Sequence, residues 1–223
     1  MVRLFGLQDV FLLRRLQSHC VGFDLRRLLL YASSPVSSAL LGYFTHHHLG
    51  AITCIDEDTV DGKSLTGFAQ VWPRGDRPEW DLGYVAPRLS SDGDAALWRR
   101  LLADLVLVGV DRGIVRIYAR ASEDAEVEDV LRQAGFIVIA REEVFALSRR
   151  QEPAPRPRPS GLRPASPQDS WALGEIYRHA VPQLVRQAEE FRFRRVSAPS
   201  GGLLASRSAD EYVWVEEGRI ISY

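Results

Sequence analysis

The alternation of hydrophobic and polar residues is clearest in the middle of the chain, where it predicts a strand, a loop, a helix and a second strand. Residues 79–86 alternate with the period of a strand. The two predicted faces carry Trp80, Leu82 and Tyr84 on one side and Glu79, Asp81 and Val85 on the other. A helix is predicted to begin near Asp94, with an apolar face of Leu97, Leu101, Leu105, Val108 and Gly109. Gly113 ends it, and a strand over 114–120 then runs parallel to the first strand through a right-handed crossover.

The N-terminal third contains further strands and helices. Asp9 is a predicted N-cap for a helix through Gln17, and Asp24 is a predicted cap for a helix over 23–31. The run Ser33-Ser34-Pro35 is expected to stop that second helix. Residues 39–44 fit a strand or a helical turn equally well. The remaining predictions are strands over 2–5, 49–55 and 65–72, a charged turn over 56–63, and an antiparallel hairpin between 65–72 and 79–86.

The second half of the chain contains a proline-rich break. A helix is predicted over 124–134 with Gly135 as its C-terminal cap, followed by strands over 136–140 and 144–147. Prolines recur through 151–160, which predicts an extended linker. Beyond the linker we predict a strand over 162–165, a helix from Asp169 to about Glu190 kinked at Pro182, and a hairpin of 212–215 with 219–222.

Composition narrows the class of protein. A hydrophobic content of 46% over 223 residues can form a packed core, and a net charge of −1 gives no general reason to expect nucleic acid or an anionic membrane as partner. Only two cysteines, Cys20 and Cys54, occur, and no apolar run approaches the length of a membrane span. Charged residues near the N-terminus do not fit a signal peptide. We therefore expect a cytoplasmic protein that does not bind membranes.

Two acidic residues of the central strand are candidates for acid–base chemistry. Glu79 or Asp81 could remove a proton from a substrate amine if nearby tryptophans desolvate the carboxylate, although both also fit a solvated strand face. Tyr84 could donate a proton, but its alternation with Trp80 and Leu82 favours a place in the core.

Three other features are explained more simply without a special chemistry. The run His46-His47-His48 has no neighbouring cysteine or carboxylate cluster, so an exposed turn is favoured over a metal site. Cys54 lies in an apolar strand and is expected to be buried. The arginine-rich stretch 186–195 could contact RNA or acyl-CoA phosphates, but a solvated helix end is favoured.

The order of predicted elements resembles the GNAT N-acetyltransferase superfamily. The residues that carry the resemblance are Asp81-Leu82-Gly83-Tyr84-Val85-Ala86-Pro87, the loop at Gly93 and the helix that ends at Gly135-Phe136. The resemblance implies an α/β fold, with a mixed, mostly antiparallel sheet, one splayed parallel strand pair and helices on both faces. It also implies transfer of an acetyl group from acetyl-CoA to a primary amine, on a small molecule or a peptide, by direct attack.

The resemblance assigns the cofactor to the gap between the splayed strands. Backbone groups of the central strand would bind the pantetheine arm, and the loop with the following helix N-terminus would bind the pyrophosphate. The cofactor-binding residues implied in this way are Leu82, Gly83, Val85, Ala86, Ser90, Ser91, Asp92, Gly93, Asp94 and Ala95. The catalytic candidates remain Glu79, Asp81 and Tyr84, and no metal is expected.

Several positions differ from the family pattern. Ser90 replaces a basic or amide residue, while Asp92 and Asp94 would lie beside the negatively charged pyrophosphate. Leu131 stands where the family often has a tyrosine that protonates the departing thiolate, and Asp124 where it often has asparagine. These differences favour an alternative for the first domain, a non-catalytic GNAT-like unit that binds a partner or supports a catalytic second domain.

The chain is expected to contain two domains. Residues 1–150 cover a GNAT-like domain, 151–160 form the linker, and 161–223 resemble the opening of a second, incomplete copy. The apolar residues of the last hairpin are expected to dock on the first domain or on another chain, which would give a homodimer through this hairpin.

Overall fold

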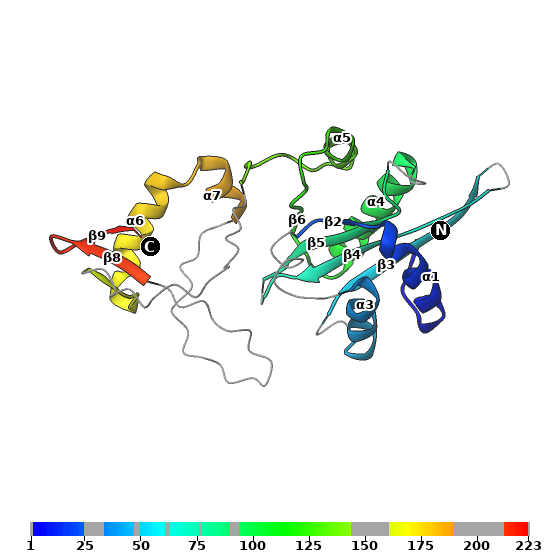
Figure 1. Ribbon diagram of the computed structural model, residues 1–223, viewed down its shortest axis with the longest axis horizontal. Coiled ribbons are helices and arrows are strands. Elements are labelled where there is room, and N and C mark those ends of the chain that lie inside the picture. The colour runs from blue at the N-terminus through cyan, green and yellow to red at the C-terminus, as the bar shows by residue number, and fades with distance from the viewer. Residues whose placement is uncertain are drawn as a thin grey trace, which may run out of the picture. The chain divides into compact units, whose positions relative to one another are not determined.

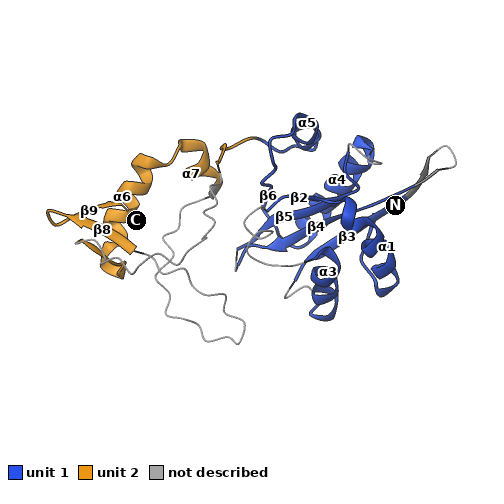
Figure 2. Cartoon of the chain, viewed as in Figure 1, with its two compact units in different colours: residues 1–137 blue, residues 138–223 orange. Residues whose placement is uncertain are grey.

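The computed structural model describes residues 2–24, 34–46, 50–60, 63–75, 77–89, 94–143, 161–189 and 212–222 (Figure 1). The chain separates into two compact units, residues 1–137 and residues 138–223 (Figure 2). The predicted domain limit at 150 and the linker over 151–160 lie outside the described residues and stay predictions.

The first unit is built on a mixed sheet in which β4 and β5 are central. The strands are β1 (Val2–Leu4), β2 (Val21–Gly22), β3 (Ile52–Val60), β4 (Lys63–Pro73), β5 (Glu79–Ala86) and β6 (Arg116–Tyr118). Their order is β1-β3-β4-β5-β2, with β6 also pairing with β5. The β5–β6 pair is parallel and the other pairs are antiparallel. The predicted α/β class and the parallel pair are confirmed.

Helices cover both faces of this sheet (Figure 1). One face packs on α4 (Ala95–Asp111) and α5 (Ala125–Gln133), whose buried residues join Trp80 and Leu82 in one hydrophobic cluster. The other face packs on α1 (Val10–Leu16) and α3 (Pro35–Phe44), with Phe68 and Trp72 in a second cluster. Short 3-10 turns, η1 (Leu7–Asp9) and η2 (Gln17–His19), flank α1. The helices on both faces of a mixed sheet are those expected from the sequence.

Ser34 caps the helix α3, which begins at Pro35 and ends at Phe44. The Ser34 side chain accepts the backbone N–H of Ser37, and Pro35 is the first helical residue. Proline is favoured there because its missing N–H has no partner in the first turn in any case. The open choice for 39–44 is thereby decided as helix. The predicted stop of the preceding helix at Ser33-Ser34-Pro35 stays a prediction, because residues 25–33 lie outside the described residues. Most of the helix predicted over 23–31 lies outside the described residues.

The predicted charged turn over 56–63 is wrong, because β3 continues to Val60 and β4 begins at Lys63. Asp56 is fully enclosed, with 1% of its side chain exposed, and it accepts a 2.8 Å hydrogen bond from the Arg100 guanidinium on α4. A buried charge needs an ionic partner. Asp56, which was assigned to the predicted turn, is therefore stabilised by Arg100 of α4, a helix that is distant from it in sequence.

Predicted and observed elements agree in much of the remaining unit. β5 has the predicted bounds, and it forms the expected antiparallel hairpin with β4. Asp94 and Asp124 cap α4 and α5 through their side chains, and Gly135 adopts a φ of +93° after α5. The strand predicted over 136–140 is wrong, since those residues form no ladder and Ile137 is 76% exposed. The strand over 144–147 lies outside the described residues.

The described part of the second unit, residues 138–143, 161–189 and 212–222, contains a three-stranded sheet and two α-helices. Its elements are β7 (Leu162–Pro164), η3 (Pro167–Asp169), α6 (Ser170–Ala180), α7 (Gln183–Glu189), β8 (Tyr212–Glu216) and β9 (Arg219–Ser222). The sheet order is β7-β8-β9, and α6 packs on β9. The predicted interruption at Pro182 and the predicted hairpin are confirmed. Among the described helices, none combines the length and apolar character that a membrane span requires.

Candidate functional site

One edge of β5 is shared by two different strands. The parallel strand β6 pairs only with the first three residues of β5, from Glu79 to Asp81. Farther along the same edge, β2 pairs antiparallel with Tyr84 and Val85. Since β4 occupies the opposite edge throughout, β5 and β6 part after Asp81 and β2 takes the place beside β5.

The segment that enters this gap, here called the inserted segment (residues 20–24), bonds to both strands. The Phe23 N–H donates to the Gly83 carbonyl at 2.8 Å, and the Arg120 N–H donates to the Phe23 carbonyl at 3.0 Å. Arg88 holds the start of the segment, because its Nε donates to the Cys20 carbonyl at 3.1 Å. The Phe23 side chain is 1% exposed and packs edge-on against Trp98 of α4, with ring centroids 6.0 Å apart.

A β-bulge at Gly83 changes the face to which β5 side chains point. Val71 is opposite Leu82 and Gln70 is opposite Tyr84, so Gly83 is the extra residue in the ladder. Val85 consequently packs in the cluster of Trp80 and Leu82, while Tyr84 packs in the opposite cluster. The predicted faces are therefore wrong for Tyr84 and Val85, because strict alternation does not survive an inserted residue.

Trp72 of β4 lies directly over the bulge. A Cβ atom added at Gly83 would lie 1.8 Å from the Trp72 ring, so no side chain fits at this position. Trp72 also meets Tyr84 edge-on at a centroid distance of 5.5 Å. Tyr84 is 4% exposed, which agrees with the place in the core that its sequence pattern favoured.

The two carboxylates of β5 lie among arginines. The Glu79 carboxylate is 4% exposed and lies 3.3 Å from Arg116 of β6 and 3.7 Å from Arg77. The Asp81 carboxylate is 19% exposed and lies 3.9 Å from both Arg74 and Arg120. Both carboxylates are therefore already engaged in ion pairs, and a substrate ammonium would have to displace an arginine to reach either of them.

Tyr118 completes this polar group on β6. The guanidinium carbon of Arg74 lies 4.3 Å from the centre of the Tyr118 ring, which is a cation–π arrangement. None of the four arginines was singled out by sequence pattern. Their charges could be counted in the sequence, but only the parallel pairing of β5 and β6 brings Arg116 and Arg120 beside Glu79 and Asp81.

The residues expected to bind acyl-CoA are described only in part. Leu82, Val85 and Ala86 are fully buried on β5, and the Gly83 carbonyl accepts from Phe23. Asp94 accepts the Ala96 N–H at 2.7 Å and so caps α4, whose first residue is Ala95. The four loop residues Ser90, Ser91, Asp92 and Gly93 lie outside the described residues.

Leu131 is a core residue of α5. It is 7% exposed and belongs to the cluster that packs under α4, so its side chain fills space and has no proton to donate. Asp124 begins the same helix and accepts the N–H groups of Glu126 and Val127. Leu131 and Asp124 therefore both have structural roles in this chain.

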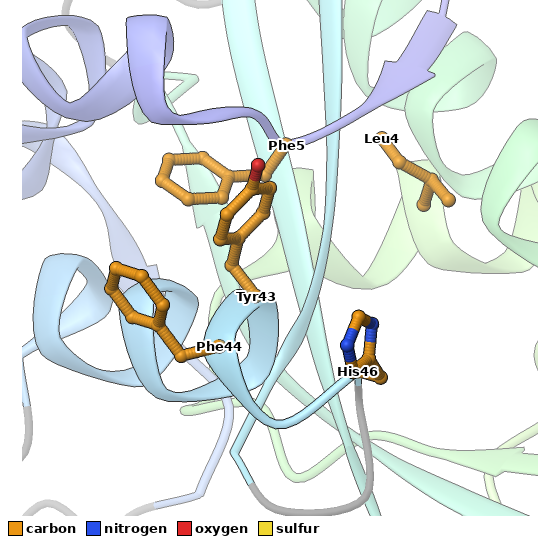
Figure 3. Close-up of a pocket in the computed structure, with 5 residues that line it drawn as sticks. All are labelled: Leu4, Phe5, Tyr43, Phe44 and His46. Carbon is orange, nitrogen blue, oxygen red and sulfur yellow. The ribbon is translucent and has the colours of Figure 1, made fainter.

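The remaining candidates do not assemble a second site among the described residues. Cys54 is buried, and burial raises the pKa of its thiol to about 12. No group of histidine, cysteine and acidic residues suited to a metal ion occurs in the described ranges. His46 borders a shallow hollow with Leu4, Phe5, Tyr43 and Phe44 on the α3 side of the sheet (Figure 3). His47 and His48 fall outside the described residues.

The inserted segment is the main feature that sequence reasoning missed. Residues 18–22 carried no assignment, because a strand of two residues is too short to produce a periodic pattern. The apolar pair Val21 and Phe23 around Gly22 was the available signal. This apolar pair can be recognised as a strand only once the fold shows that β6 leaves the edge of β5 after Asp81.

No family model matches the chain, and no curated protein matches it significantly. Several solved structures are similar to it over nearly their whole length. One is described as a probable acetyltransferase (18% identity, TM-score 0.42, 68% of this chain and 99% of that one). Another is AAC(6')-Iy in complex with the bisubstrate analog CoA-S-monomethyl-acetylneamine (17%, 0.44, 66% and 97%). A third is a wild-type protein of Thermus thermophilus (19%, 0.39, 69% and 99%). Similarity at these levels does not define the activity of this chain.

Proposed function

We propose that this protein acts in acyl-CoA-dependent N-acyl transfer, in which an acetyl group passes from acetyl-CoA to a primary amine by direct attack. The observation that carries the proposal is the separation of β5 from β6 after three paired residues, beside the bulge at Gly83. The separation leaves β5 an edge that β6 does not pair, and a pantetheine arm could bond this edge in place of β2. The first turn of α4 has N–H groups without partners inside the helix, which favours an anion, although the Asp94 carboxylate already accepts from one of them.

In this proposal the backbone and the arginine group supply most of the chemistry. Backbone N–H groups at the bulge would stabilise the oxyanion that forms when the amine attacks the thioester carbonyl. The attacking amine must lose a proton, and Glu79 or Asp81 would accept it only after exchanging an arginine partner for the substrate ammonium. The acceptor amine belongs to a small molecule or a peptide.

A second candidate function is favoured for the first unit by the positions of Leu131 and the inserted segment. Leu131 cannot protonate a thiolate, and residues 20–24 occupy the edge of β5. The first unit would then be a non-catalytic GNAT-like unit that binds a partner or supports a catalytic second domain. Repetition of the opening elements in the second unit, β7–η3–α6 after β1–η1–α1, supports this tandem reading.

Calorimetric and thermal titration of acetyl-CoA into the 223-residue chain tests the proposal. A site with a dissociation constant of about 10 μM would stabilise the folded protein by about 2.7 kcal/mol at about 1 mM ligand. For a unit of this size, that stabilisation raises the melting temperature by about 5 to 11 °C. Thiol release with a panel of primary amines then measures transfer. Binding without transfer would favour the supporting role, and the absence of both would contradict acyl-CoA chemistry in this chain.

A further inference from the structure

We propose that the inserted segment regulates the acyl-CoA site of the first unit by competing with the ligand for one edge of β5. This inference rests on the proposed function, because that function assigns the pantetheine arm to the same edge. The segment and the ligand would exclude each other, so acyl-CoA binds only when residues 20–24 leave the gap between β5 and β6.

Exclusion follows from the hydrogen bonds that the segment makes. The Gly83 carbonyl accepts from Phe23, and β2 pairs with Tyr84 and Val85, so these backbone groups cannot bond a ligand at the same time. The Phe23 carbonyl reaches across to the Arg120 N–H. The segment therefore bridges both sides of the gap, at the point where β5 and β6 have separated.

Two contacts hold the inserted segment in place, while its short ladder with β5 favours release. Phe23 is anchored against Trp98, and Arg88 clamps Cys20. The ladder with β5 is only two residues long, however, so few backbone hydrogen bonds break on release. A ligand that bonds the same edge of β5 would replace the bonds to that strand. The cost of opening is then the exposure of Phe23 and the loss of the bonds from Arg120 and Arg88.

Competition predicts that the apparent affinity for acetyl-CoA is set by the open fraction of the protein. The apparent dissociation constant equals the intrinsic constant divided by that fraction. Loosening the anchor should therefore tighten binding, although no residue that contacts the ligand has changed. A segment with a purely structural role would give the opposite result, because a damaged fold binds less.

The test compares acetyl-CoA binding to the full chain and to three variants by calorimetry. Phe23→Ala removes the anchor, and we expect binding at least about tenfold tighter than in the unmodified chain. Val21→Pro weakens the ladder without altering the Phe23 contact with Trp98, and we expect tightening in the same direction. Phe11→Ala is the matched control, because it removes the same ring from an 80% exposed position on α1 and should leave binding unchanged. Circular dichroism establishes that each variant is folded.

Hydrogen exchange of single amides separates failure of this inference from failure of the proposed function. With acetyl-CoA bound to the unmodified chain, we expect the Phe23 and Arg120 amides to lose protection while Val85 keeps it. Binding with Phe23 still protected would overturn the competition and leave acyl-CoA binding intact. In a folded variant, rapid exchange of the amide at residue 23 shows that the segment has left the gap. If such a variant binds no acetyl-CoA, both the proposed competition and the proposed acyl-CoA site are contradicted.

Discussion

At the scale of single residues, the first unit depends on a glycine that no side chain can replace. Gly83 is the extra residue of the β5 bulge, and the Trp72 ring fills the space where a Cβ would lie. The glycine lets the strand change faces, so that Tyr84 joins the α1–α3 side and Val85 joins the α4 side. A small residue thereby sets the direction of every following side chain of β5.

Gly83→Ala should lower the free energy of unfolding by about 1 to 3 kcal/mol, because the added methyl group must displace Trp72 or the strand. Urea denaturation of the full chain measures the effect. Gly174→Ala serves as control: it lies in α6 with open space around its Cβ and should be neutral or stabilising by about 0.5 to 1 kcal/mol. Equal effects at both positions would contradict the packing described for Trp72.

Asp9 joins the start of β1 to the first helical turn through Arg3. The Arg3 guanidinium donates to both carboxylate oxygens at 2.5 and 2.6 Å, and the Gly6 N–H donates to one of them at 2.8 Å. The bonds from Arg3, followed by that from Gly6, lower the pKa of Asp9 below its ordinary value. The ionised form is therefore bound more tightly in the folded chain than in the unfolded one.

A lowered folded-state pKa gives stability that is present above about pH 4 and is lost as pH falls through the folded pKa. Asp9→Asn should therefore cost about 1 to 2 kcal/mol at neutral pH, a value reduced by the partial exposure of Arg3, and much less near pH 2. Thermal unfolding from about pH 2 to 7 measures both. A constant loss across that range would mean that the charge of Asp9 is unimportant.

At the scale of elements, the long β3–β4 hairpin is joined to α4 by an ion pair. Arg100 from the second turn of α4 reaches Asp56, which lies in β3 opposite Gly67 of β4. The same helix packs its apolar face on these strands through Leu97 and Leu101. One helix therefore contributes both burial and the counter-charge that allows an acidic residue inside the sheet.

Arg100→Ala should destabilise the first unit by about 2 kcal/mol, since the Asp56 carboxylate is left without this partner. The value lies below that for a fully buried pair because the Arg100 side chain is 37% exposed. Arg99→Ala is the matched control, as that neighbouring side chain bonds Gln133 at the surface and its loss should cost no more than about 0.5 kcal/mol. A double-mutant cycle with Asp56→Ala that gives no coupling energy would refute the pairing.

At the scale of the whole chain, the two units begin in the same way. Arg163 bonds both carboxylate oxygens of Asp169 at 2.7 Å, as Arg3 does with Asp9, and the Ser166 N–H bonds Asp169 where Gly6 bonds Asp9. Each arginine–aspartate pair joins a short strand to a 3-10 turn and a helix. Each of these strands, β1 and β7, pairs with the first strand of a following hairpin. The hydrogen bonds from Arg163, followed by that from the Ser166 N–H, lower the pKa of Asp169 as well.

Residues 1–150 are predicted to fold without the remainder of the chain, because the first unit contains both of its hydrophobic clusters. Limited proteolysis should cut within 151–160 and leave a stable N-terminal fragment that unfolds cooperatively. A fragment that unfolds without cooperativity would contradict an independent first domain.

The apolar hairpin of β8 and β9 is predicted to dock on the first domain or on another chain. Light scattering of the full chain measures any association.

The sequence by itself determined the elements whose signals are local. The helix starts near Asp94 and Asp124, the glycine after α5, the β4–β5 hairpin and the interruption at Pro182 all depend on neighbours a few residues away. Their backbone preferences are strong enough to persist in the fold. The class of fold followed from their order.

Tertiary structure alone decided what lies beside β5. Phe23 reaches Gly83 and Trp98, and Arg116 reaches Glu79, across long stretches of sequence. The bulge and the ion pairs depend on space and charge supplied by other strands, so periodicity within β5 could not predict them. Local preference specifies a strand, but its edge bonds whichever backbone the complete fold brings to it, and in this chain that backbone is residues 20–24.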